Sequence, residues 1–192
     1  MNTPSPFFIG CPSRDGQGLV QSVLALGHLE AWLQRPIAFI MGIGSNIPRA
    51  RNGVMDQIRR DFGLQTHWVL WWDSDILVTP DQIPAVAAMI RFGQEHQMAV
   101  TANYRINTGE HVLMQTIDGT IHRFTDQGLA ALPEWAPIES TGLGFCYCPV
   151  EAEYIFHADR MGEDVHFWHD HPDLELRVTK AVQLRHAKTV WL

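Results

Sequence analysis

Two aspartates separated by one residue follow directly after a long apolar run. The run extends from Trp68 to Trp72, and Asp73 and Asp75 come after it, on either side of Ser74. Consecutive bulky apolar residues predict a strand buried on both faces, and ligands of open α/β sheets bind at the carboxyl ends of such strands. Two carboxylates this close repel each other, so we expect a divalent cation or an arginine to offset them. The alternative is a turn in which Asp73 caps backbone amides.

Alternating apolar runs and helical patterns predict the elements that position these aspartates. We expect strands at residues 7–10, 37–41, 68–72 and 98–103, with helices between them, which is typical of a largely parallel sheet. The second helix is expected to begin at about Pro48 and to end at Gly63. The third helix follows a capping box formed by Thr79 and Gln82.

The alternation breaks down after about residue 103. We expect a hairpin from residues 111–116 and 120–124, a loop or short helix at 129–138, a strand at 144–148 and a short helix at 150–157. A further helix is expected from Gly162, with Glu163 and Asp164 in its first turn. Two short strands are then expected at residues 174–178 and 181–184.

The composition limits the class of protein. The 192 residues, with 46% hydrophobic and 18% charged, predict a single globular domain. A net charge of −7 argues against a generally basic nucleic-acid binder. Three cysteines without a CxxC pair, Cys11, Cys146 and Cys148, are interpreted as packing thiols in a reducing compartment. Without a signal pattern or an apolar run of about 20 residues, we expect no membrane span and a cytoplasmic location.

Five segments, taken together in their order, resemble the nucleotide-sugar glycosyltransferases of the GT-A fold. They are Arg51-Asn52, similar to the family's ARN segment; Asp73-Ser74-Asp75, similar to its DxD motif; residues 140–145 (STGLGF), similar to its small glycine-containing segment; residues 161–167 (MGEDVHF), similar to its GED-V-x-F segment; and His186, at the C-terminal position of a further metal ligand. The resemblance is to compact, family 2-like bacterial and phage enzymes. It implies an α/β fold of the GT-A (nucleotide-diphospho-sugar transferase) type, with a Rossmann-like mixed sheet flanked by helices.

A divalent metal, Mn²⁺ or Mg²⁺, is the cofactor that the resemblance implies. In the family this ion bridges the donor's diphosphate and neutralises charge on the leaving nucleoside diphosphate. Carried onto this chain, Asp75 is a direct ligand, His186 a second ligand, and Asp73 a contact to the ribose or to a metal-bound water. An imidazole ligand favours Mn²⁺ over Mg²⁺. The alternative for His186 is an ordinary surface or strand histidine.

The implied donor is a nucleoside-diphosphate sugar, with a UDP-sugar expected. Residues 10–16 stand where the family holds the nucleotide, so Pro12 and Arg14 are assigned to donor binding. Arg51 is expected to bind the diphosphate, because it lies near a helix start whose amide dipole favours anions; the alternative is a solvated helix arginine. Gly142 and Gly144 complete the predicted cofactor-binding set. Residues 1–103 thus form the expected nucleotide-sugar half, and residues 104–192 the acceptor and catalytic half.

Glu163 and Asp164 are the expected catalytic residues. In inverting members of the family, a carboxylate of this segment takes the proton from the acceptor hydroxyl as it attacks the anomeric carbon. Asp164 is the first choice and Glu163 the second. Simple capping of the helix start is the alternative, and a retaining mechanism becomes open if the base is absent.

The sequence leaves the acceptor and the oligomeric state undetermined. A saccharide, a small molecule, a protein side chain or a hydroxymethylated base in phage DNA remain open as acceptors, the last placing the protein in the host cytoplasm. Trp135 is a stacking platform for such an acceptor or a core anchor. Two other classes compete: a nucleotidyltransferase, which normally has a basic glycine-rich loop after its first strand, and a non-catalytic nucleotide- or sugar-binding protein. Arg14 is the only basic residue of residues 12–18.

Overall fold

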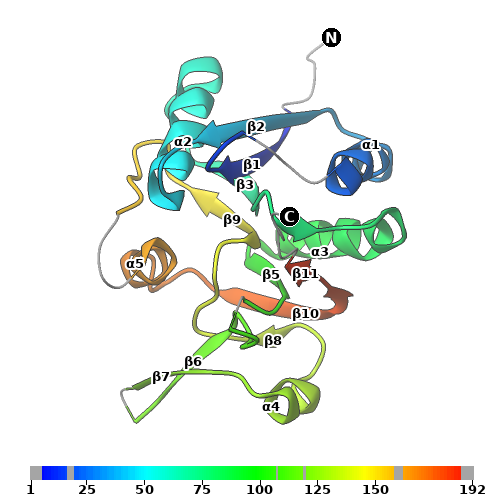
Figure 1. The fold of residues 1–192 in the computed structure, drawn as a ribbon, viewed down its shortest axis with the longest axis vertical. Helices are drawn as coiled ribbons and strands as arrows, with labels where there is room; N and C mark the ends of the chain where they lie inside the picture. Colours follow the sequence, from blue (N-terminus) through cyan, green and yellow to red (C-terminus); the bar gives the residue numbers. More distant parts are fainter. Residues whose placement is uncertain (1–5, 17–19, 107, 119, 158–161, 187–192) are drawn as a thin grey trace, which may run out of the picture.

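A seven-stranded mixed sheet forms the centre of the protein, with helices on both of its faces (Figure 1). The computed structural model describes residues 6–16, 20–106, 108–118, 120–157 and 162–186. The strand order is β2-β1-β3-β9-β5-β10-β8. Three parallel strands make up one side of the sheet: β1 (Phe7–Ser13), β2 (Ile37–Ile43) and β3 (His67–Trp72). The first strand is therefore longer than the predicted 7–10, because Cys11, Pro12 and Ser13 keep pairing with β2.

The antiparallel strand β9 (Phe145–Val150) separates β3 from β5 (Ala99–Asn103), which continues the sheet through β10 (Leu176–Gln183). A short edge strand, β8 (Ala136–Pro137), runs antiparallel to β10. The expectation of a largely parallel sheet thus holds for the first half of the chain, and the whole sheet is mixed. Strands from both halves of the chain thus join in one sheet, and two small strand pairs form separate sheets.

The helices divide between the two faces of the sheet. In Figure 1, α1 (Val20–Leu33) and α3 (Ile83–His96) lie on one side, whereas α2 (Ile47–Phe62) and α5 (Glu163–Asp170) lie on the other. A 3-10 turn, η1 (Pro80–Gln82), leads into α3. The short helix α4 (Asp126–Ala131) lies beside the hairpin of the second half.

The predicted helix boundaries follow from local side chains. At the start of α2 the Asn46 side chain accepts a hydrogen bond from the backbone N–H of Arg49, and Gly63, with φ +99°, ends the helix. The capping box of Thr79 and Gln82 is present before α3, as predicted.

The tryptophan-rich strand β3 is the centre of the core, as its sequence predicts. Trp71 is fully buried and meets Phe156 edge to face at a centroid distance of 5.3 Å. Trp72 makes a similar contact with Phe145 at 5.4 Å. Only glycine fits at Gly10 of the neighbouring strand, because a Cβ there would lie 2.7 Å from the Trp71 ring.

Two predictions in the second half of the chain are wrong. The helix expected at 150–157 is absent: Val150 ends β9, and residues 151–157 form turns and an extended segment. The reason is a clamp by Asn52, whose amide accepts from the Phe156 N–H at 2.8 Å and donates to the Phe156 carbonyl at 3.0 Å. The two short strands expected at 174–178 and 181–184 are one strand, β10, with a register shift between Thr179 and Gln183.

Two small sheets complete the fold. The hairpin of β6 (Met114–Ile117) and β7 (Thr120–Arg123) forms where the sequence predicts it. The second pair joins β4 (Ile76–Leu77) to β11 (Arg185–His186) in antiparallel register, with His186 opposite Ile76. This pairing brings the C-terminal segment next to the aspartates that follow β3. Within the described part of the chain, no helix has the length and apolar character that crossing a bilayer requires.

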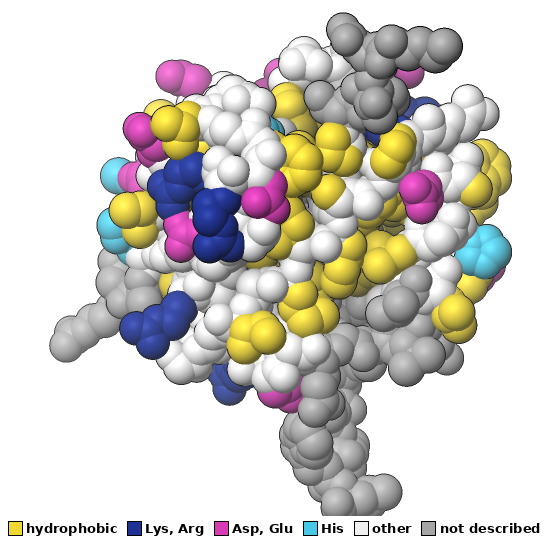
Figure 2. Space-filling view, turned by 90° about the horizontal axis from the view of Figure 1, so that it is seen from above, with side chains coloured by type: hydrophobic (Ala, Val, Ile, Leu, Met, Phe, Trp, Pro, Cys, Tyr) yellow, Lys and Arg dark blue, Asp and Glu magenta, His cyan; other side chains and the backbone are white. Residues whose placement is uncertain are grey.

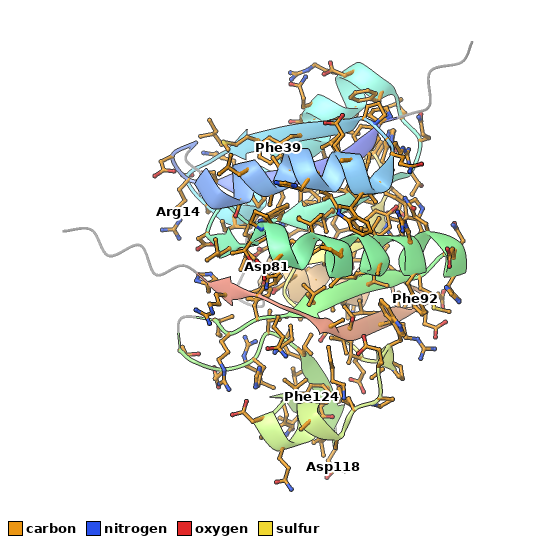
Figure 3. The ribbon with its side chains drawn as sticks, turned by 90° about the vertical axis from the view of Figure 1, so that its right-hand side faces the viewer. Arg14, Phe39, Asp81, Phe92, Asp118 and Phe124 are labelled. Atoms are coloured by element: carbon orange, nitrogen blue, oxygen red, sulfur yellow. The ribbon has the colours of Figure 1, made fainter. Side chains whose placement is uncertain are left out.

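The sheet edge at β2 is apolar. Among the described residues β2 pairs only with β1, and its side chains Phe39 and Ile43 are exposed, as are Leu24 and Trp32 of α1. Figure 2, which looks onto this end of the molecule, shows hydrophobic side chains gathered across the face, and Figure 3 shows Phe39 on β2 above α1.

Candidate functional site

Asp73 and Asp75 stand at the carboxyl edge of the parallel strands, as the sequence predicts. The turn that carries them is tied to both neighbouring strands by backbone hydrogen bonds. The N–H of Asp73 donates to the carbonyl of Gly144 at 2.8 Å, and the N–H of Ser74 donates to the carbonyl of Pro12 at 3.4 Å. These hydrogen bonds therefore fix the backbone that carries the two carboxylates.

A buried arginine lies behind the aspartates. Arg51 of α2 is 1% exposed, and its Nη2 lies 3.1 Å from Asp73 Oδ1. Its Nε lies 3.6 Å from Glu163 Oε1, its Nη1 donates to the Leu143 carbonyl at 3.3 Å, and its guanidinium carbon lies 5.1 Å from the centre of the Trp71 ring. Arg51 is thus not a solvated helix arginine: it joins two acids from distant segments. A contact between Arg51 and a diphosphate stays a prediction.

The charges of this group shift one another's protonation. Burial raises the pKa of Asp73 to about 6; Arg51 opposes that shift, and Asp75 adds to it. Burial disfavours the charged form of Arg51, but Asp73 and then Glu163 outweigh it and raise the pKa of the guanidinium. Arg51 therefore stays charged at every physiological pH, and it is the main group that keeps Asp73 from a higher pKa.

Asp75 and His186 meet at the mouth of the site. Their Oδ2 and Nε2 atoms are 3.2 Å apart, and the two side chains are 41% and 18% exposed. The pairing of β4 with β11 positions them, since it places His186 directly opposite Ile76. The structure thus brings together two residues that the sequence separates by more than half its length, and that were assigned jointly to a metal.

Glu163 and Asp164 open α5, as the sequence predicts, and both face the same site. Glu163 pairs with Arg51, whereas Asp164 accepts a hydrogen bond from the backbone N–H of Val165 at 3.0 Å. Burial, followed by the charge of Glu163, raises the pKa of Asp164. A higher pKa makes a carboxylate a stronger base, so the shift has the direction that proton abstraction needs. Gly162, with φ +87°, gives α5 its entry angle in a conformation that favours glycine.

Tyr104 is a site residue that the sequence reasoning missed. Its side chain is buried, and its hydroxyl accepts a hydrogen bond from the Gly144 N–H at 3.1 Å. A Cβ at Gly144 would lie 2.2 Å from that hydroxyl oxygen and 3.0 Å from Asp73 Oδ2, and a Cβ at Gly142 would lie 3.0 Å from the hydroxyl and 3.3 Å from Asp164 Oδ2. Both glycines are needed to admit the phenol between the acids. Its position in the sequence could have indicated this role, because Tyr104 directly follows β5 and so lies at the same sheet edge.

The remaining predicted donor-binding residues lie at the end of β1. Pro12 is buried within the strand, and its carbonyl holds Ser74. Arg14 is exposed, just beyond the strand, and extends away from the molecule (Figure 3). The structure therefore places both residues at the carboxyl edge that carries Asp73, and their contact with a nucleotide stays a prediction.

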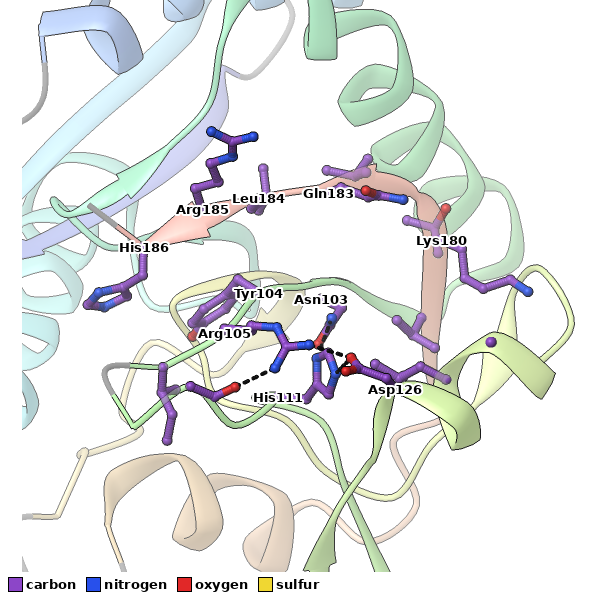
Figure 4. Close-up of a pocket in the computed structure, with 17 residues that line it drawn as sticks. Asn103, Tyr104, Arg105, His111, Asp126, Lys180, Gln183, Leu184, Arg185 and His186 are labelled. Atoms are coloured by element: carbon purple, nitrogen blue, oxygen red, sulfur yellow. Dashed lines mark hydrogen bonds and ion pairs between the residues drawn. The ribbon is translucent and has the colours of Figure 1, made fainter. Parts of the chain in front are cut away.

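A cavity of about 660 Å³ opens next to His186 (Figure 4). Tyr104 and His186 line its inner end, and Asp126, Leu129 and Lys180 line the other. The predicted stacking platform, Trp135, does not line this cavity: its ring stacks on Phe92 of α3 at a centroid distance of 3.9 Å and an angle of 4°. Trp135 is therefore a packing anchor.

The acidic cluster, meaning Asp73, Asp75, Glu163 and Asp164, sets four carboxylates against the single guanidinium of Arg51. This excess of negative charge favours a cation in the site. Within the described residues, no three side chains of His, Cys, Asp or Glu form a metal site by themselves. A metal here would take part of its ligands from a bound molecule.

Comparisons with known proteins identify no family for this chain. No protein-family model matches the chain, and no curated protein matches it. The functional argument therefore depends on the chemistry of the site itself.

Proposed function

We propose that this protein is a metal-dependent glycosyltransferase of the GT-A fold. It moves a sugar from a nucleoside-diphosphate sugar, with a UDP-sugar as the first choice, to an acceptor hydroxyl with inversion. One observation carries the proposal: the acids of two distant segments, Asp73 with Asp75 and Glu163 with Asp164, converge with His186 of a third segment around one sheet edge. The mixed sheet flanked by helices supports the Rossmann-like architecture that this function requires.

The residues at the mouth of the site fit a divalent cation in part. Asp75 offers a carboxylate oxygen and His186 an imidazole nitrogen, and the two atoms lie 3.2 Å apart. Nδ1 of His186 is buried without a hydrogen-bond partner among the described residues, whereas metal-bound histidines usually donate from their second nitrogen. Asp75 and His186 would hold the cation, with Asp73 reaching it through water. When bound, the ion supplies positive charge that stabilises the leaving diphosphate.

The protein's own side chains would divide the remaining work. The acceptor oxygen forms a bond to the anomeric carbon while the bond from that carbon to the diphosphate oxygen breaks. Asp164, whose pKa burial raises, takes the hydroxyl proton as the new bond forms. Arg51 stays charged and therefore moves no proton. Its guanidinium instead fixes Asp73 and Glu163 in place.

The test is turnover with a panel of nucleotide sugars in the presence of Mn²⁺. We expect slow release of nucleoside diphosphate even without an acceptor. Asp75→Ala should abolish metal-dependent nucleotide binding, measured by thermal shift, because it removes the most exposed ligand. Asp81→Ala, an exposed aspartate of η1, serves as the matched control and should bind normally.

Asp164→Asn separates binding from chemistry. The amide keeps the shape of the side chain but accepts no proton, so nucleotide binding should persist while turnover falls by two orders of magnitude or more. Normal turnover in this variant contradicts the assignment of the base. Release of pyrophosphate from a nucleoside triphosphate and a sugar phosphate, in place of sugar transfer, assigns the protein to the nucleotidyltransferases.

A further inference from the structure

A second set of polar side chains, separate from the acidic cluster, lines the cavity beside His186. It comprises Asn103, Arg105, His111 and Asp126, here called the Asp126 group. His111 Nε2 lies 2.7 Å from Asp126 Oδ1, and Asn103 Nδ2 lies 2.9 Å from His111 Nδ1. Arg105 binds the same Asp126 oxygen and donates to the Gly109 carbonyl (Figure 4). The His111 side chain is only 8% exposed, so it contacts Asp126 from the buried side.

Asp126 is held in place and still faces the cavity. Its side chain is 75% exposed. Both contacts use Oδ1, which leaves Oδ2 to accept a hydrogen bond from a ligand. The hydrogen bonds from His111 and then Arg105 lower the pKa of Asp126, so the carboxylate stays ionised. Beside it, Arg105 offers N–H donors. This wall therefore presents one acceptor and one donor side by side.

The remaining wall of the cavity is apolar. It is formed by Leu129 of α4, which is half-buried, and by the buried side chains of Val178, Val182 and Leu184. A ligand that fits must have an apolar face and, at its edge, groups that donate and accept. A pyranose ring has both, because its C–H bonds form one face and its vicinal hydroxyls form hydrogen bonds to paired donors and acceptors. The volume of about 660 Å³ lies within the usual range of small-molecule sites.

The charges around the cavity argue against a nucleic acid. Arg105 and Asp126 neutralise each other. Lys180 binds the Leu132 carbonyl, with the Glu134 carboxylate on its backbone N–H, and Arg185 points away from the cavity in Figure 4. A phosphate backbone requires clustered free cations, and the exposed Asp126 carboxylate repels it. The exposed Asp126 carboxylate therefore favours a ligand that offers hydroxyl donors over a polyanion.

We propose that this cavity is the acceptor site and that the acceptor is a neutral mono- or disaccharide. Its vicinal hydroxyls bind Asp126 and Arg105, its ring lies on the apolar wall, and its reacting hydroxyl lies at the His186 end. His186 connects the two sites, because it lines the cavity and contacts Asp75 at 3.2 Å. The role of the saccharide as acceptor rests on the proposed glycosyl transfer, whereas saccharide binding by the cavity does not depend on it.

The experiment compares three acceptor classes in the transfer assay: neutral mono- and disaccharides, the corresponding sugar phosphates, and duplex DNA containing hydroxymethylcytosine. We expect transfer to a neutral saccharide and none to the DNA. Asp126→Asn should raise the KM for that saccharide about tenfold or more, since it weakens a hydrogen bond to a charged group. Asp118→Asn makes the same chemical change at the exposed tip of the β6–β7 hairpin and should leave the KM unchanged.

The outcomes separate this inference from the proposed function. If the wild-type protein turns over a nucleotide sugar but transfers only to DNA or to sugar phosphates, the inference is overturned and the function stands. If no nucleotide sugar is turned over, saccharide binding is measured directly by NMR titration. Binding that Asp126→Asn weakens supports the cavity site in that case, and no binding, or equal binding by the variant, overturns it.

Discussion

Replacing Arg51 by methionine should destabilise the protein strongly, although the new side chain is apolar and similar in length. The Arg51 side chain is 2% exposed, and its guanidinium is the partner of Asp73 at 3.1 Å and of Glu163 at 3.6 Å. Removing it leaves an uncompensated carboxylate in a place where burial already raises the pKa of Asp73 to about 6. Breaking one partner of a buried ion pair costs about 3–5 kcal/mol. Asp73 is 20% exposed, so we expect a loss of about 3 kcal/mol at neutral pH.

The same reasoning predicts how the loss depends on pH. Without Arg51 the pKa of Asp73 rises further, while the unfolded chain keeps the ordinary value of about 3.8. The folded variant then holds a proton that the unfolded chain releases, so its stability falls as pH rises through this interval. Relative to the wild-type protein, Arg51→Met should lose little at pH 4 and the full amount at pH 8.

The assay is urea denaturation followed by tryptophan fluorescence at pH 4, 6 and 8. Arg59→Met is the matched control on the same helix, because Arg59 is 37% exposed and pairs across one turn with Asp56, which is itself exposed; its loss should stay within about 1 kcal/mol. Adding Asp73→Asn to Arg51→Met should recover part of the loss, since it removes the stranded charge. Equal losses for the two arginine variants, or a double variant less stable than Arg51→Met, would refute the reasoning.

Two glycine substitutions should move stability in opposite directions. Gly144→Ala places a Cβ 2.2 Å from the Tyr104 hydroxyl oxygen and should cost about 1–3 kcal/mol in urea denaturation; combining it with Tyr104→Phe should reduce that cost, and an undiminished cost would mean that another contact is responsible. Gly27→Ala, inside α1 with nothing within 4 Å of the added methyl, should stabilise the protein by about 0.5–1 kcal/mol, and a loss of stability would contradict the open space assigned to that position.

Local features could be predicted because they depend on neighbours in the sequence. The apolar strand β3, the cap of η1 by Thr79 and Gln82, and the start of α5 at Glu163 all form as expected. Each is decided by alternation, capping or turn chemistry within a few residues. The strand ends also placed Asp73 correctly, since parallel strands share one carboxyl edge.

Contacts between distant segments could not be predicted in the same way. The loop at 151–157 is extended because Asn52, 104 residues away from Phe156, binds both of its backbone polar groups. Arg51 is expected near an anion from its helix position, yet it lies buried against Asp73 and Glu163. Only the packing of α2 onto β1 and β2, with α5 on the same face of the sheet, decides this.

The sequence by itself thus determined which acids stand at strand and helix ends, because backbone geometry there follows from local residue types. The tertiary structure alone decided which of them meet. It placed Tyr104 between the glycines, paired His186 with Asp75, and assembled the Asp126 group around a cavity. The physical reason is that burial and charge pairing are properties of three-dimensional neighbours, and those neighbours come from strands whose order in the sheet differs from their order in the chain.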